Sequence, residues 1–330
     1  MGCDMGGSVI SHGLDNGDGG GTAANGQLES GEVDHSTTFC SSSGTAAMVV
    51  ADVRPGSSGI NPNNFVVFNN VLYFNGNDGS HGQELWQYDG VNAPSMVANL
   101  RYGSSSSSPN NFVVFNNELY FSASDGLNGR ELWKYDGVNT PSMVADIYSG
   151  SSSSSPSDLI VFNNELYFEA SDGTNGNELW KYDGVNAPSM VADITPGTGN
   201  FNPDNFVVFN NELYFRGDDG IHGMELWKYD GINTPIMVAD INSGSGSSAP
   251  SDLIVFNNEL YFSASDVGYN FELWRYNGID MYIAGDIRPG SFGSNPNELI
   301  VFNNGLYFEA NDGPNGDELW TYDGNNPPSM

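Results

Sequence analysis

The sequence predicts an all-β fold, a six-bladed β-propeller of four-stranded antiparallel blades. A unit of about 47 residues repeats six times from Met48 to Met330, and repeats of this length are typical of propellers and solenoids. Each unit alternates short apolar runs with turn signals. The chain is rich in Gly, Ser, Asn and Pro, with only 9 Lys and Arg among 330 residues, so long helices are disfavoured.

Every unit carries the same landmarks: a Phe-Asn-Asn turn, a Leu-Tyr-Phe run and a Glu-Leu-Trp, with an Asp-Gly turn before the Glu-Leu-Trp in all units but the fifth. One tryptophan per unit accounts for all 6 tryptophans of the chain. The six runs extend from Phe68 to Trp86, Phe115 to Trp133, Phe162 to Trp180, Phe209 to Trp227, Phe256 to Trp274 and Phe302 to Trp320. The fifth unit has Asp266-Val267 where the other units have Asp-Gly.

The third unit shows how the landmarks translate into strands. We expect strands over residues 158–162, 165–170, 178–182 and 190–194, separated by turns at Asn-Asn and Asp-Gly pairs. Such a meander has apolar side chains on both faces, and radial stacking of blades gives each face a partner. A flat solenoid is the alternative, but its coils are usually shorter and its strands parallel.

The two ends of the repeat region predict how the ring closes. Residues 48–53 read as a fourth strand with no unit before it, and the sixth unit stops at Met330 where its fourth strand should begin. We therefore predict that the strand at 48–53 completes the last blade. Truncation of a longer array at Met330 stays open as an alternative. Residues 1–47 form a Gly/Ser/Asp-rich arm, in which Cys3 and Cys40 either form a disulfide or remain two thiols.

The formal net charge of -32 limits the classes of partner. An acidic surface repels phosphate backbones and anionic headgroups, so nucleic acid is not an expected partner. Membrane insertion is not expected either, because no stretch approaches the ~20 apolar residues of a span. The N-terminus lacks the basic and apolar regions of a secretory signal, so if the protein is exported, we expect that its signal has already been removed.

The run from Asp172 to Trp180, followed by Tyr182-Asp183-Gly184, resembles the bacterial ELWxxDGT repeat, a hyalin-type propeller family. The resemblance covers residues 48–330. It implies propeller blades and an extracellular or cell-surface location, and it says little about function. The chain departs from the family pattern at Val185-Asn186, where the family usually has Thr after the second Asp-Gly.

Acidic residues recur once per unit and suggest Ca²⁺ as a cofactor, because Ca²⁺ prefers oxygen ligands. The alternative is structural: an Asp before Gly often closes a turn on its own backbone, and a Glu at a strand start often pairs with a neighbouring amide. The first ring is the turn aspartate, at Asp78, Asp125, Asp172, Asp219, Asp266 and Asp312. The second is the glutamate before Leu-Trp, at Glu84, Glu131, Glu178, Glu225, Glu272 and Glu318.

Two further sets are candidate ligand-binding residues. One set precedes the innermost strands and is expected to ring the mouth of the central channel, where it holds a cation or waters or simply caps strand ends: Asn64, Asn111, Asp158, Asn205, Asp252 and Glu298. The other set comprises aromatic residues in the blade connections, which suit stacking on sugar rings: Tyr102, Tyr148, Phe201 and Phe292.

Catalysis has little support in the sequence. His81 and His222 occupy a loop position where most other units carry Asn, and paired carboxylates occur equally in every unit, whereas an active site usually breaks repeat symmetry. We therefore predict a non-enzymatic structural or adhesive module, possible partners being a glycan, a surface protein or further copies of the chain. A lectin with repeated sites on the loop face is the alternative, and a propeller-type hydrolase is the second alternative.

Overall fold

The computed structural model describes residues 7–13, 33–40, 50–54, 57–267, 270–290 and 292–330, and only the backbone in the first two ranges. The chain divides into two compact units, Met1–Asp52 and Val53–Met330, which places the boundary a few residues later than the sequence repeat does. The first unit contains an antiparallel pair, β1 (Gly7–Gly13) and β2 (Val33–Cys40), with Gly7 opposite Cys40. Cys3 lies outside the described residues, so the predicted disulfide stays a prediction.

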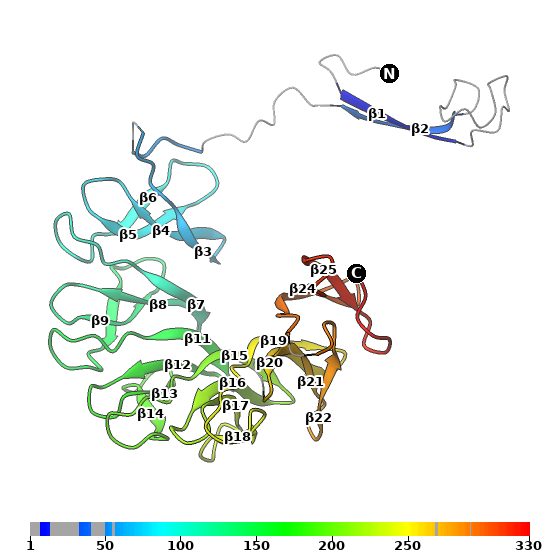
Figure 1. The fold of residues 1–330 in the computed structure, drawn as a ribbon. Helices are drawn as coiled ribbons and strands as arrows, with labels where there is room; N and C mark the ends of the chain where they lie inside the picture. Colours follow the sequence, from blue (N-terminus) through cyan, green and yellow to red (C-terminus); the bar gives the residue numbers. More distant parts are fainter. Residues whose placement is uncertain (1–6, 14–32, 41–49, 55–56, 268–269, 291) are drawn as a thin grey trace. The chain divides into compact units, whose positions relative to one another are not determined.

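The second unit contains six antiparallel sheets in chain order (Figure 1). The first has β3 (Asn63–Phe68), β4 (Val71–Asn77), β5 (Gln83–Tyr88) and β6 (Ser95–Ala98). The second has β7 (Asn110–Phe115), β8 (Glu118–Ser124), β9 (Arg130–Tyr135) and β10 (Ser142–Ala145). The third has β11 (Ser157–Phe162), β12 (Glu165–Ser171), β13 (Asn177–Tyr182) and β14 (Ser189–Ala192). The fourth has β15 (Asp204–Phe209), β16 (Glu212–Asp218), β17 (Met224–Tyr229) and β18 (Ile236–Ala239). The fifth has β19 (Ser251–Phe256), β20 (Glu259–Ser265), β21 (Phe271–Tyr276) and β22 (Met281–Gly285), and the sixth has β23 (Asn297–Phe302), β24 (Gly305–Asn311) and β25 (Asp317–Tyr322).

The Asn-Asn pairs set the register of each blade. In the third blade Asn163 and Asn164 have φ of 47° and 60°, so both residues of the two-residue turn are left-handed. Asparagine tolerates this conformation, and turns of this kind match the twist of an antiparallel pair. Phe162 therefore faces Glu165 across the hairpin. The predicted meander of strands is confirmed, with bounds that differ by one or two residues.

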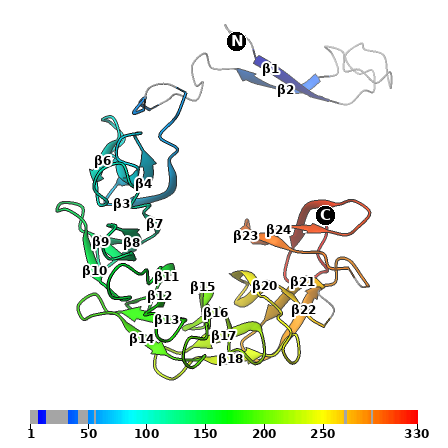
Figure 2. The ribbon, with the colours of Figure 1, turned by 60° about the vertical axis from the view of Figure 1, so that its left-hand side comes forward.

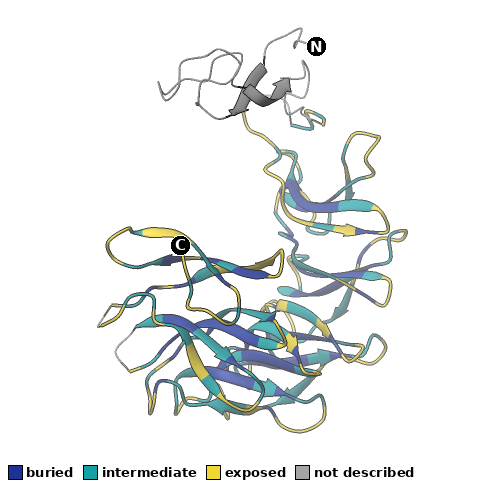
Figure 3. Cartoon of the chain, turned by 90° about the vertical axis from the view of Figure 1, so that its right-hand side faces the viewer, coloured by how far each residue is buried: buried dark blue, intermediate teal, exposed yellow. Residues whose placement is uncertain are grey.

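Neighbouring blades are joined by apolar packing, visible as buried residues along the middle of the sheets in Figure 3. At each junction one blade contributes the Phe of its Phe-Asn-Asn turn, the Tyr of Leu-Tyr-Phe and the Leu before Trp. The following blade contributes its Leu, Phe, Trp and second Tyr, and the two Tyr rings lie 5.7–6.0 Å apart in all five junctions. The innermost strands of successive blades lie side by side. This is the architecture of a β-propeller.

The sixth blade differs from the others. It has three strands, and a single bridge between Thr321 and Ser329 stands where the fourth strand would be. Residues 50–53 form no strand, and residues 48 and 49 lie outside the described part of the chain. The predicted closure by residues 48–53 is therefore not shown. Among the described residues no packed cluster joins the sixth blade to the first, and the second unit follows an arc (Figure 2).

Candidate functional site

The turn aspartates are engaged by their own loops. In the third blade Asp172 Oδ1 accepts hydrogen bonds from the amides of Thr174 (2.7 Å) and Asn175 (2.9 Å), while Oδ2 accepts one from Asn175 Nδ2 (2.7 Å). Equivalent bonds form at Asp78, Asp125, Asp219 and Asp312. Burial raises the pKa of Asp172, but these hydrogen bonds outweigh it and hold the pKa below its usual value. The carboxylates act as local turn closures.

The two loop histidines contact the turn aspartate in the way that asparagine does in other blades. His81 Nδ1 lies 2.7 Å from Asp78 Oδ2, and His222 Nδ1 lies 2.7 Å from Asp219 Oδ2. In the second blade Asn128 Nδ2 donates to the equivalent oxygen, Asp125 Oδ2, at 2.8 Å. The prediction that these histidines are loop variants is therefore consistent with one shared hydrogen-bond role.

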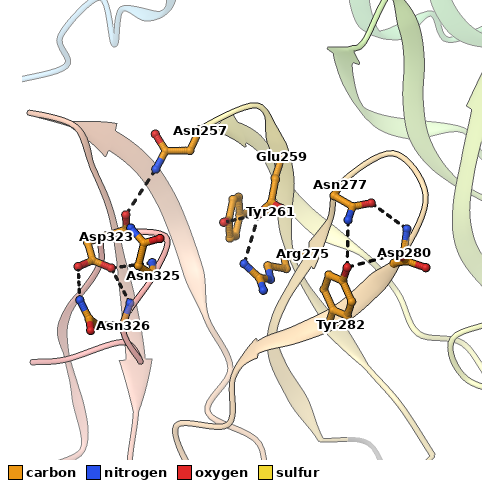
Figure 4. A network of polar contacts seen from close by, with 10 residues as sticks. All are labelled: Asn257, Glu259, Tyr261, Arg275, Asn277, Asp280, Tyr282, Asp323, Asn325 and Asn326. Atoms are coloured by element: carbon orange, nitrogen blue, oxygen red, sulfur yellow. Dashed lines mark hydrogen bonds and ion pairs between the residues drawn. The ribbon is translucent and has the colours of Figure 1, made fainter.

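A second set of Asp-Gly turns links neighbouring blades. Asp323 accepts hydrogen bonds from the amides of Asn325 and Asn326, and its backbone oxygen accepts one from Asn257 Nδ2 in the preceding blade at 3.4 Å (Figure 4). The asparagine of the Phe-Asn-Asn turn thus reaches the turn after Trp in the next blade. Asn277, which stands in place of Asp in the fifth blade, closes its loop in the same way through the amides of Ile279 and Asp280.

Five of the six glutamates before Leu-Trp are buried at a blade junction, whereas Glu318, in the sixth blade, is exposed. Glu131 accepts hydrogen bonds from the amide of Ile147 (2.9 Å), the amide of Ser154 (2.9 Å) and the hydroxyl of Ser154 (2.5 Å). Ser154 belongs to the connection that leads into the next blade. Burial raises the pKa of Glu131, and the serine donors oppose that rise. Glu84, Glu225 and Glu272 make the same contacts with Ser107, Ser248 and Ser294.

Glu178 is the exception among the buried glutamates of this ring. The residue facing it in the connection is Phe201, which is fully buried and offers no hydroxyl. Glu178 Oε2 accepts a bond from the amide of Ile194 at 3.1 Å, and Oε1 has no hydrogen-bond partner. Burial raises the pKa of Glu178 to about 7. Neither Glu178 nor Glu131 lies in a set of metal ligands: in the described ranges no three His, Cys, Asp or Glu side chains are grouped to hold a metal ion. The Ca²⁺ prediction stays a prediction.

The ring of residues predicted to precede the innermost strands instead lies at the second position of those strands, in a repeated β-bulge. All six residues have left-handed φ between 52° and 55°, and pairing shifts register just after each of them: Asn64, Asn111, Asp158, Asn205, Asp252 and Glu298. Asn111 Nδ2 donates to the backbone oxygen of Pro156 at 3.3 Å, so this side chain also joins two blades. The bulge explains why polar residues recur here, since Asn and Asp adopt left-handed φ more readily than most residues.

A charged cluster that the sequence reasoning missed lies beside this ring, at the third and fourth blades. Asp204 pairs with Arg216, with Nη2 to Oδ2 at 2.6 Å, and Glu169 accepts a hydrogen bond from Ser157 at 2.7 Å. Burial and then the negative charge of Asp204 raise the pKa of Asp158. Burial also raises the pKa of Glu169. Arg216 stands where other units have Asn, Ser or Glu, so a break in the repeat was the available signal.

The aromatic candidates have different environments. Tyr102 is 94% exposed beside a cavity of about 610 Å³ that Arg101, Asp125, Leu127 and Trp133 also line. Tyr148 instead lies over the turn glycine of the next blade, where a Cβ on Gly173 would meet its ring at 2.1 Å.

Phe292 is exposed beneath the guanidinium of Arg288, 4.9 Å from the ring centroid. Phe201 is buried, with its ring 4.9 Å from that of Trp227, so its predicted role as an exposed stacking residue is wrong. Phe201 lies 47 residues after Ser154, and this spacing in the sequence would have placed it at a blade junction.

No protein-family model matches the chain, and no curated protein matches its sequence. Solved structures are similar in fold. A Mycobacterium tuberculosis puromycin-hydrolyzing peptidase matches with a TM-score of 0.53 and 10% identity, over 80% of this chain and 43% of the peptidase. The β-propeller domain of the Trilobed protease from Pyrococcus furiosus, described as having an open velcro topology, matches with a TM-score of 0.48 and 10% identity, over 82% and 83%. The SapL1 lectin in complex with α-methyl fucoside matches with a TM-score of 0.38 and 12% identity, over 78% and 90%.

These similarities concern the fold alone. The chain spans less than half the length of the peptidase, and propellers serve many functions. No helix among the described residues is long and apolar enough to cross a membrane.

Proposed function

We propose that the chain is a non-enzymatic structural or adhesive β-propeller module that acts outside the cell or on its surface. The observation that carries this proposal is the use of the repeated polar residues. The turn aspartates close their own loops, and four of the buried glutamates bind the serine of the next connection. Polar residues that make these internal hydrogen bonds in most blades stabilise the scaffold. The resemblance to ELWxxDGT repeats supports the extracellular location.

The experiment is an adhesion assay. Beads coated with the purified full chain are passed over surfaces coated with collagen, peptidoglycan or the chain itself, and retention under flow is compared with that of albumin-coated beads. Retention above the albumin level on at least one surface is expected. Retention equal to albumin on every surface would overturn the adhesive proposal.

A carbohydrate-binding role is the second candidate, and the cavity beside Tyr102 favours it. An exposed aromatic ring next to Arg101 and Asp125 offers a stacking surface with polar groups at its margin. A glycan array probed with the wild type, once with millimolar Ca²⁺ and once with chelator, tests this role and the Ca²⁺ prediction together. The lectin would be supported if Tyr102→Ala loses the array signal while Val138→Ala, a change on an exposed turn, retains it. Silence in both conditions would remove it.

A hydrolase is the remaining alternative, and the carboxylates of Asp158 and Glu169 are where it would have to act. Ion pairing of Asp204 with Arg216 gives this cluster a structural explanation. Peptidase and glycosidase substrate panels are expected to show no turnover. Turnover that Glu169→Gln abolishes, in a variant with unchanged circular dichroism, would replace the adhesive proposal with a catalytic one.

A further inference from the structure

The exposed face of the sixth blade has the same composition as faces that are buried elsewhere. Phe302 is 60% exposed, whereas the equivalent phenylalanines of the first five blades are 2–3% exposed. Leu319 is 67% exposed, whereas its five equivalents are fully buried. Around Leu319, Ile300 and Tyr307 the face forms a hollow of about 350 Å³. In the first five blades the following blade covers this surface.

The first blade exposes the complementary face. Phe65 is 59% exposed, while Phe112 and Phe206, at the same position of later blades, pack into the junction with the preceding blade. Tyr88 is half-buried, while its equivalents from Tyr135 to Tyr322 are buried against the Tyr of the preceding blade. The two ends of the second unit therefore carry the two halves of one junction.

The chain's own first blade does not cover the sixth. Closing the arc within one chain would require movement at all five existing junctions. Each of these is filled by buried rings, and the cross-blade Tyr pairs keep nearly one spacing, 5.7–6.0 Å. Packed interfaces of this kind do not deform continuously. A second copy can bring its first blade to the free face without any change within either chain.

We propose that the sixth blade of one copy binds the first blade of a second copy, head to tail, through a sixth junction of the same kind. The proposal rests on the structural role proposed above and names its partner. Tyr307 of one copy would lie against Tyr88 of the next, and Phe302 and Leu319 would be buried. A contact between two different faces leaves one of each face free at the ends, so assembly continues as an open chain.

The charge of the chain sets the conditions for assembly. A net charge of -32 makes copies repel one another. Salt shortens the Debye length from about 10 Å at 0.1 M to about 3 Å at 1 M, which weakens that repulsion, and apolar burial gains from exclusion of salt such as sulfate. Assembly should therefore increase with salt, the opposite of a contact made by ion pairs.

The test is molar mass by light scattering after size-exclusion chromatography, across protein concentrations, with reductant present and with 0.1 or 1 M NaCl. The wild type should exceed its monomer mass of 35.4 kDa, and the excess should grow with concentration and salt. Phe302→Asp blocks one face and Phe65→Asp the other, so each variant alone should be monomeric. Their mixture should give a dimer and nothing longer, because one intact face of each kind remains. Val185→Asp, on an exposed turn, should assemble like the wild type.

Three outcomes would overturn the proposal: a wild type of monomer mass under every condition, single variants that still assemble, or a mixture that stays monomeric although both variants retain the wild-type circular dichroism. The adhesion assay above separates this proposal from the proposed function. Retention on collagen or peptidoglycan by a monomeric protein would leave the adhesive function standing without the head-to-tail contact. Assembly with retention on the chain-coated surface alone would support the contact without adhesion to another partner.

Discussion

Replacing Glu178 with Gln should change how the stability of the protein depends on pH. Glu178 is fully buried, and one of its oxygens has no hydrogen-bond partner because Phe201 stands where the other connections have serine. Burial raises its pKa from an ordinary 4.5 to about 7. Between these values the folded chain holds a proton that the unfolded chain has released. The free energy of unfolding therefore falls as pH rises through this window and stays low above it.

The size of the effect follows from the pKa. A rise from 4.5 to about 7 corresponds to roughly 3 kcal/mol in total. Roughly 1 kcal/mol of this has been lost by pH 5.5, which leaves about 2 kcal/mol to be lost between pH 5.5 and 8. Glutamine does not ionise, so Glu178→Gln should remove that last part. The amide brings a cost of its own, which is the same at both pH values and cancels in the comparison.

Guanidinium denaturation followed by tryptophan fluorescence gives the free energy of unfolding at pH 5.5 and 8, away from the pI of about 4.1. The free energy of unfolding of the variant minus that of the wild type should rise by about 2 kcal/mol from pH 5.5 to pH 8. Glu131→Gln is the matched control: three donors hold the Glu131 carboxylate, so the gain should be smaller. Equal gains in both variants, or none at Glu178, would refute the role assigned to the missing serine.

Two matched pairs test the packing of the blades. Phe162→Ala leaves a cavity in a buried junction and should lower the free energy of unfolding by about 3–5 kcal/mol. Phe302→Ala, on the open face, should lower it by less than about 1 kcal/mol in dilute solution. Equal losses in denaturant titrations would contradict the assignment of the open face. Gly129→Ala would place a Cβ 1.8 Å from the Ser152 carbonyl oxygen and should lower the melting temperature strongly. Gly103→Ala meets nothing within 4 Å and should cost only the left-handed backbone strain of about 1–2 kcal/mol, so similar melting temperatures for the two glycine variants would refute the close approach at Gly129.

The repeat made the fold predictable because local rules and packing agree in every unit. Asn163 and Asn164 indicate a hairpin by themselves, and the spacing from Phe162 to Trp180 places apolar residues on both faces of the sheet. Closure was less predictable. The run at residues 48–53 has the composition of a strand, but pairing with a blade about 270 residues away depends on the accumulated angle of five junctions, which no local pattern encodes.

The residues that distinguish this chain from an ideal array are those that depart from the repeat. Phe201 in place of serine leaves Glu178 with an unpaired oxygen, and Arg216 introduces an ion pair with Asp204 at the inner edge. The repeat shows which positions are equivalent between blades. The effect of a residue that differs from its equivalents depends on which side chains of the neighbouring blade contact it. The same reasoning applies at the two ends. Phe65 and Phe302 obey the repeat fully, and they are exposed because, in the part of the chain that the structure describes, no blade packs against either of them. The equivalents of these side chains are buried in the existing junctions, and the same apolar side chains at the free faces favour burial against a partner. Assembly at the free faces is therefore the property of this fold most worth measuring.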